Sequence, residues 1–137
     1  MGKIIFTNGC FDILHRGHLE LFRFAKGLGD RLIVGIDSDG KVVRDKGPSR
    51  PINSINERKF MLESIRWIDE VYVFQDTRGL ETLVRNISPD ILVIGSDWKG
   101  KKIIGRDYAK EVKYFDRVEG YSTTKIVESF INRRLLY

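Results

Sequence analysis

The sequence has little cysteine, proline or histidine, and each scarcity narrows the class of protein. Cys10 is the single cysteine among 137 residues, so no disulfide can form within the chain, which favours a reducing, cytoplasmic location. Three prolines and 31% charged residues beside 42% hydrophobic ones fit a folded domain rather than a disordered segment. No apolar run reaches the roughly 18 residues of a membrane span, and we expect no signal peptide.

The length of the chain indicates the number of domains, and its net charge indicates the kind of binding partner. A chain of 137 residues predicts one domain covering residues 1–137. Lysine and arginine number 24 against 19 acidic residues, which gives a net charge of +5. This excess favours anionic partners such as phosphates or nucleic acid, without choosing between them.

Apolar segments alternate with helical patterns along the chain. Strands are predicted at 4–7, 31–36, 71–74, 91–94 and 112–115. Helices are predicted at about 19–27, after a capping box at 54–57, at 80–87, and at 124–135, the last with Ile126, Val127, Phe130 and Ile131 inward. The later part of the polar segment 37–53 is expected to be a mobile loop. The order predicts an α/β fold, a single Rossmann-like doubly wound parallel five-stranded sheet with helices on both faces.

Ligands of such sheets bind at the carboxyl ends of the strands, and both histidines of the protein follow the first strand. His15 and His18 lie on one side of a helical turn and are flanked by Gly9 and Gly17. A helix start attracts phosphate, imidazoles donate hydrogen bonds to its oxygens, and protonated imidazoles would add positive charge. The alternatives are surface or capping histidines, or a metal site. We predict no metal ligand, because His-x-x-His offers two ligands and a third would have to come from Asp12 or elsewhere.

The segment Gly9-Cys10-Phe11-Asp12-Ile13-Leu14-His15-Arg16-Gly17-His18 resembles the His-x-Gly-His signature of the cytidylyltransferase-like nucleotidyltransferases. Further segments match this family in the same order, so the resemblance covers nearly the whole chain. Residues 46–53 resemble a loop in the nucleotidyltransferase domain of bacterial ADP-heptose synthases. Residues 95–101 are similar to the Gly-Asp-Asp-Trp and Gly-Lys segment of glycerol-3-phosphate cytidylyltransferases. Residues 117–124 resemble the Arg-Thr-Glu-Gly-Ile-Ser-Thr-Thr signature, with Val118 and Tyr121 as departures.

The resemblance implies a role for each matching residue. The catalytic set would be His15, His18, Lys46 and Arg117. Arg58 and Lys46 would bind the acceptor phosphate. The nucleotide would be bound by Gly9, Cys10, Phe11, Asp12, Gly17, Asp97, Trp98, Ser122, Thr123 and Thr124, with the backbone N–H groups of Cys10 and Phe11 cradling a phosphate. Plainer interpretations stay open: a solvated charge for Lys46, helix capping for the hydroxyl residues, and a core cover for Trp98.

The implied reaction is attack of a substrate phosphate on the α-phosphorus of a nucleoside triphosphate, with release of pyrophosphate and with Mg²⁺ as cofactor. The resemblance favours ATP with D-glycero-D-manno-heptose 1-phosphate, and the alternative is CTP with glycerol 3-phosphate. The resemblance also implies a homodimer. A non-catalytic nucleotide-binding or nucleic-acid-binding protein is the competing class. We expect no nucleic-acid partner, because the basic residues are dispersed and no reading module is visible.

Overall fold

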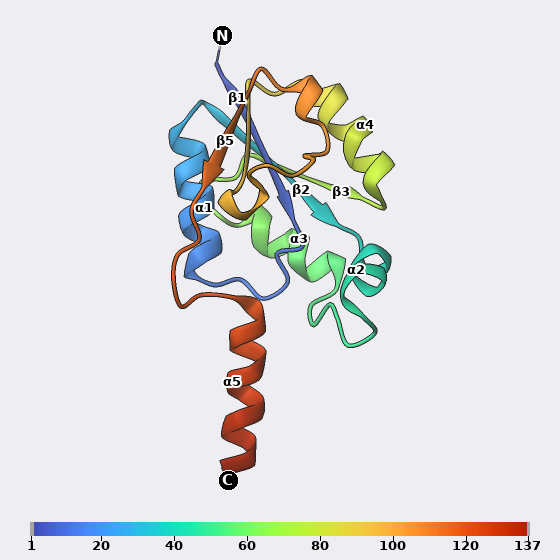
Figure 1. Cartoon of the computed structure of the whole chain (residues 1–137), viewed down its shortest axis with the longest axis vertical. Helices are drawn as coiled ribbons and strands as arrows, with labels where there is room; N and C mark the ends of the chain where they lie inside the picture. Colours follow the sequence, from blue (N-terminus) through green and yellow to red (C-terminus); the bar gives the residue numbers. More distant parts are fainter. Residues whose placement is uncertain (1, 137) are drawn as a thin grey trace.

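The computed structural model describes residues 2–136, with side chains as far as Arg133, and its centre is a parallel sheet (Figure 1). Its five strands run in the spatial order β3-β2-β1-β4-β5. Their bounds are β1 Ile4–Gly9, β2 Arg31–Asp37, β3 Glu70–Phe74, β4 Ile91–Gly95 and β5 Glu111–Phe115. All four pairings are parallel. The predicted five-stranded α/β architecture is confirmed.

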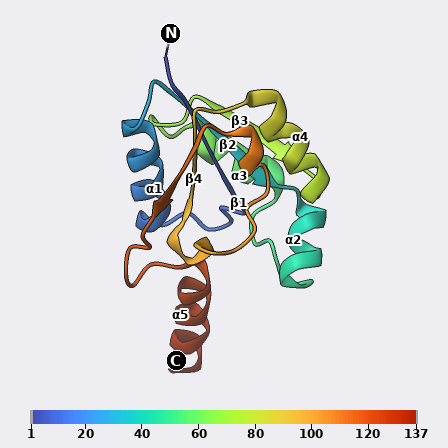
Figure 2. The ribbon, with the colours of Figure 1, turned by 45° about the horizontal axis from the view of Figure 1, so that its top comes forward.

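Both faces of the sheet are covered by helices. Side chains of consecutive strand residues point to opposite faces, so each strand contributes to two buried clusters. Ile5 of β1 belongs to one buried cluster and its neighbour Phe6 to the other. The first cluster includes residues of α1 (Arg16–Gly27) and α3 (Ile55–Glu63), and the second includes residues of α4 (Thr77–Ile87). Helix α4 and helix α1 accordingly lie on opposite sides of the sheet in Figure 2.

Two helices after β2 differ from expectation. Residues Asp39–Lys46 form helix α2, where the sequence had predicted only a polar segment, and the loop follows at 47–54. Ser38 caps α2, since its hydroxyl accepts a hydrogen bond from the Lys41 N–H at 3.2 Å. Ser54 occupies the cap position of α3 as predicted, but its side chain makes no capping hydrogen bond.

The last helix, α5 (Thr123–Leu136), is present as predicted but does not pack as predicted. It extends away from the sheet (Figure 1). Ile126 and Val127 are half-buried, but Phe130 is 69% exposed and Ile131 is 55% exposed. The inward placement of Phe130 and Ile131 is therefore wrong, because a periodic apolar pattern shows that a helix has an apolar face without showing what covers it.

The strand order reverses between β1 and β4, and this reversal places the site. Chain leaving β1 turns toward α1, whereas chain leaving β4 continues into a 3₁₀ turn at Ser96–Trp98. The two segments separate at the carboxyl edge, where a crevice for ligands opens in folds of this kind. None of the helices in the described part of the chain has the length and apolar character to span a bilayer.

Candidate active site

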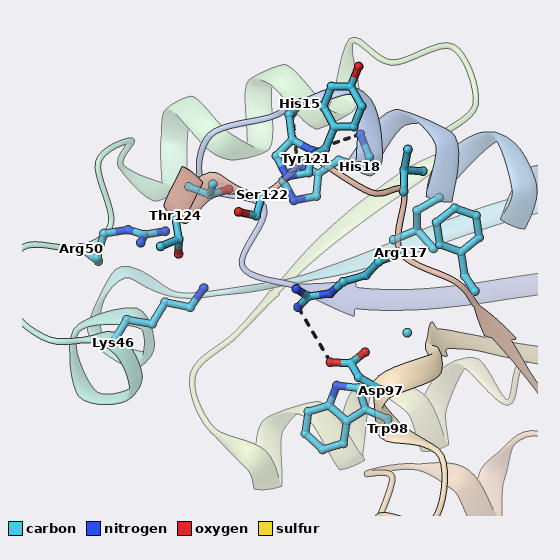
Figure 3. A pocket seen from close by; sticks show the side chains of 16 residues that line it. His15, His18, Lys46, Arg50, Asp97, Trp98, Arg117, Tyr121, Ser122 and Thr124 are labelled. Atoms are coloured by element: carbon cyan, nitrogen blue, oxygen red, sulfur yellow. Dashed lines mark hydrogen bonds and ion pairs between the residues drawn. The ribbon is translucent and has the colours of Figure 1, made fainter. Parts of the chain in front are cut away.

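A cavity of about 410 Å³, called here the main cavity, opens at the carboxyl edge of the sheet (Figure 3). Its walls come from four parts of the chain: the start of α1, the end of α2 with the following loop, the turn after β4, and the segment from β5 to α5. The predicted site residues that line it are His15, Gly17, His18, Lys46, Asp97, Trp98, Arg117, Ser122, Thr123 and Thr124. The fold therefore brings most of the predicted set together.

The two imidazoles form a stacked pair at the start of α1. Their ring centroids lie 3.8 Å apart with 24° between the planes. His15 is the N-cap, and its Nδ1 accepts a hydrogen bond from the Gly17 N–H at 3.0 Å. The Nδ1 of His18 accepts from the His15 N–H at 3.3 Å. With Nδ1 as acceptor, a neutral ring carries its proton on Nε2, so both residues keep an N–H free for a ligand.

Burial keeps these rings uncharged. Desolvation, together with the neighbouring His15 and Lys46, lowers the pKa of His18 to about 3. Burial and the nearby Arg117 guanidinium also lower the pKa of His15 below its ordinary value. At neutral pH the pair therefore supplies hydrogen-bond donors, and the positive charge considered from the sequence is absent from it.

The aromatic ring of Phe11 packs against the imidazole ring of His18. The Phe11 ring is buried and packs edge-on against His18, with centroids 5.4 Å apart, and against Phe22 at 5.0 Å. A side chain on Gly9 would place its Cβ 2.9 Å from the Phe11 ring, and one on Gly17 would lie 2.9 Å from Cε1 of His15. The two glycines make room for these rings, in addition to any approach by a ligand.

Among the described residues, three cations line the main cavity. Lys46 is the exposed last residue of α2 rather than part of a loop, and its ammonium group points into the cavity in Figure 3. Arg117 approaches from the opposite side and lies 3.8 Å from Asp97 in a weak ion pair. Arg50 contributes the third charge, with 14% of its side chain exposed. Such an arrangement suits a polyanion held between two walls.

The start of α5 completes the cavity. The Ser122 hydroxyl accepts a hydrogen bond from the Lys125 N–H at 3.0 Å, so capping, the plainer role considered for these residues, is present at Ser122. The Thr123 hydroxyl donates to the Ile13 carbonyl at 3.1 Å, which joins this segment to the loop that carries the histidines. Thr124 lines the same wall. A helix start beside a cavity favours phosphate, because its N–H groups and the positive end of the helix dipole attract anions.

Asp12 is not placed to bind a nucleotide or a metal ion. It is 2% exposed, and its carboxylate accepts hydrogen bonds from the Ile52 N–H at 2.7 Å, the Asn53 N–H at 2.8 Å and Arg50 Nε at 3.1 Å. Burial alone raises the pKa of this carboxyl, but these hydrogen bonds outweigh it and hold the pKa below its usual value. Asp12 instead fixes the loop after α2 against the histidine segment. Among the described residues no group of three or more His, Cys, Asp and Glu side chains is arranged to hold a metal ion.

Arg58 is also not placed to meet an acceptor phosphate. It is completely buried, and its guanidinium donates to the carbonyls of Asn53 at 3.0 Å, Cys10 at 2.9 Å and Asp37 at 2.8 Å. A fourth contact joins it to the Asp39 carboxylate at 2.7 Å. The expected substrate-binding role of Arg58 is therefore replaced by a structural one, because its donors are used within the protein.

The remaining predicted residues lie beside the main cavity rather than in it. Cys10 and Phe11 do not line it, and Gly9 lines a second cavity described below. Conversely, Arg50 and Tyr121 line the main cavity without having been assigned a role. The Tyr121 ring is roughly parallel to the His15 ring at 6.3 Å. The available signal for Arg50 was its place in the polar segment 37–53, which also contains Lys41, Arg44 and Lys46. Tyr121 stood within the matching segment 117–124.

Comparison with known proteins finds a sequence match over most of the chain. The cytidylyltransferase-like family model matches residues 6–129. The chain belongs to the cytidylyltransferase-like family. This membership confirms the expected nucleotidyltransferase class, and the main cavity is the candidate active site of that class.

Curated relatives of this family member include two bacterial proteins named bifunctional protein HldE. The chain is 52% identical over 126 residues to the one from a Nitratiruptor species, covering 92% of this chain and 27% of the relative. It is 50% identical over 126 residues to the one from Helicobacter pylori (strain Shi470), again covering 92% of this chain and 27% of the relative. The chain thus spans little more than a quarter of the relatives it matches.

Solved structures agree on the fold. The lipopolysaccharide core biosynthesis protein from Thermoplasma volcanium superposes with a TM-score of 0.66 at 25% identity, over 89% of this chain and 100% of that one. A pantothenate synthetase from Thermus thermophilus superposes with a TM-score of 0.56 at 14% identity, over 85% of this chain and 56% of that one. At that identity the second likeness shows the fold alone.

We predict that Arg58→Leu lowers the free energy of unfolding by about 3 kcal/mol, because three carbonyls lose their buried donor. Urea unfolding followed by circular dichroism measures the change. The matched control is Arg78→Leu, which removes an exposed guanidinium on α4 and should change stability by less than about 0.5 kcal/mol. Similar losses for the two variants would contradict the role assigned to Arg58.

A second prediction concerns pH. An unfolded histidine protonates near pH 6.5, whereas folded His18 stays neutral down to about 3, so stability is lost as pH falls below 6.5. Between pH 7.5 and 5.5 the wild type should lose about 1 kcal/mol more unfolding free energy than His18→Gln. Urea titrations at both pH values measure this difference. Parallel losses would show that His18 is not desolvated.

Proposed function

We propose that the protein transfers a nucleoside monophosphate from ATP to a sugar phosphate, with D-glycero-D-manno-heptose 1-phosphate as the acceptor and pyrophosphate as the second product. One observation carries this proposal: two uncharged imidazole N–H donors and three cations surround one cavity at the strand reversal. The name HldE of the curated relatives and the resemblance of residues 46–53 to ADP-heptose synthases support the heptose acceptor.

The chemistry needs positioning more than proton transfer. An acceptor phosphate is already an anion at neutral pH, so its oxygen attacks the α-phosphorus without a strong base. A new phosphorus–oxygen bond forms as the bond from the α-phosphorus to the bridging oxygen breaks, and that oxygen leaves with pyrophosphate. The Nε2–H groups of His15 and His18 donate to the α-phosphate oxygens as charge shifts in the transition state. Lys46 and Arg117 hold the two anions together across the cavity.

Magnesium would enter mainly with the triphosphate. Within the part of the chain that the structure describes, Asp97 is the one carboxylate that lines the main cavity, and 53% of its side chain is exposed. Such a lining fits an ion that takes most of its ligands from phosphate oxygens and water, and Asp97, which the sequence did not predict as a metal ligand, would be its protein ligand. When bound, the ion would neutralise charge on the leaving pyrophosphate.

A second pair of substrates, CTP with glycerol 3-phosphate, is favoured by Trp98. This side chain is 45% exposed and borders the main cavity, where it offers a stacking surface next to the Gly100-Lys101 segment that resembles the cytidylyltransferases. A homodimer, a cytoplasmic location and the lack of a nucleic-acid partner stay predictions from the sequence.

The test is pyrophosphate release by the purified chain with each of the four nucleoside triphosphates, crossed with heptose 1-phosphate, glycerol 3-phosphate and other sugar and polyol phosphates. We expect the highest kcat/KM with ATP and heptose 1-phosphate. A preference for CTP with glycerol 3-phosphate would select the second pair. No release with any combination would overturn the proposed reaction in favour of nucleotide binding without turnover.

The histidine pair makes a sharper prediction. His15→Ala and His18→Ala should each lower kcat by about 10²–10³, because each removes a donor to the transition state. His18→Gln retains an N–H donor and should keep more activity than His18→Ala. Circular dichroism of each variant checks that the fold is intact. Full activity in either folded alanine variant would contradict the assigned roles.

A further inference from the structure

A second cavity lies against the main one and has a different character. Its volume is about 390 Å³, within the range of about 300–1,000 Å³ that is usual for small-molecule sites. Its walls are the ends of β1, β2, β3 and β4, together with residues of α2, α4 and the segment after β4. Leu21, Gly95 and Trp98 line both cavities, so a molecule bound in one lies beside a molecule bound in the other.

The charge of the second cavity does not suit a polyphosphate. Asp37 and Asp45 line it, and its one lysine, Lys41, is already paired with both, at 3.6 Å and 2.6 Å respectively. Among the described residues, two carboxylates and one lysine line the second cavity, whereas three cations and one carboxylate line the main cavity. Two carboxylates repel a phosphate but accept hydrogen bonds from hydroxyl groups.

Asp37 is the group best placed to read a ligand. It ends β2, 14% of its side chain is exposed, and among the described residues the distant pair with Lys41 is its one ion pair within 4 Å. Burial raises the pKa of this carboxyl. A partly desolvated carboxylate without a close partner gains most from new hydrogen bonds. Phe74, Leu80 and Ile103 add apolar surface to the same cavity, and the carbon skeleton of a hydroxylated ligand can pack on such surface.

We propose that the second cavity binds the uncharged, hydroxylated body of the acceptor, with Asp37 accepting hydrogen bonds from its hydroxyl groups and so selecting among acceptors. This inference rests on the proposed function. The acceptor phosphate stays in the main cavity near Lys46 and the histidines, and the polyol or sugar portion extends past Trp98 into the second cavity. Asp37 is thus a candidate residue for acceptor recognition, whereas Arg58 is buried and does not reach the acceptor.

The test uses the full chain and the acceptor that supports pyrophosphate release. Asp37→Asn and Asp37→Ala should raise the KM for that acceptor about tenfold or more, the effect of losing a hydrogen bond to a charged group. The KM for the nucleoside triphosphate should stay within twofold. The matched control is Asp107→Asn, which alters an exposed carboxylate outside both cavities and should change neither KM.

A steric variant keeps the test independent of Asp37. Thr77 lines the second cavity at the start of α4, and Thr77→Phe should fill part of the space and raise the acceptor KM without changing the nucleotide KM. An acceptor KM that stays unchanged in the folded Asp37 and Thr77 variants would overturn the second cavity as the acceptor site while leaving the nucleotidyltransferase reaction intact. Absence of turnover in the wild type with every acceptor would instead overturn the proposed function, and this inference with it.

Discussion

The buried guanidinium of Arg58 is the interaction on which the carboxyl edge of the sheet depends. Its donors reach chain segments that leave β1, leave β2, begin α2 and precede α3, through Cys10, Asp37, Asp39 and Asn53. Carbonyl groups at strand ends have no partners within the sheet, so a buried donor must satisfy them. Because one planar group serves these segments together, their relative positions are set jointly. The Asp12 carboxylate also connects the segment after β1 to the segment before α3, because it accepts hydrogen bonds from the N–H groups of Ile52 and Asn53.

The two neighbouring cavities at this edge of the sheet differ in their electrostatic environment. Within the described residues, the main cavity is lined by three cations, one carboxylate and two uncharged imidazoles, and the second cavity by two carboxylates with a lysine paired to both. A substrate with a phosphate at one end and hydroxyl groups at the other matches both cavities in a single orientation. Orientation of this kind is what in-line attack between two anions requires, since neither anion approaches the other spontaneously.

The sequence predicted the strands well and the helical surroundings less well, for physical reasons. Strands buried on both faces need continuous apolar runs, and such runs are visible at Leu32–Ile36 and Ile91–Ile94. Helix α2 buries only Val42, so its sequence carries almost no periodic signal. The histidine pair was found because its motif is local. The burial of Arg58 and the attachment of Asp12 to residues 52 and 53 depend on partners distant in sequence, which no local pattern contains.

The contact between Thr123 and the Ile13 carbonyl bridges 110 positions of the chain. The two walls of the main cavity are thus supplied by segments about 110 positions apart, of which the histidine segment is synthesised first. A polypeptide still emerging from the ribosome carries the imidazoles long before the hydroxyl-rich turn that faces them exists. Formation of the main cavity is consequently a property of the finished fold, because a chain synthesised only as far as β4 lacks the wall that Ser122, Thr123 and Thr124 supply.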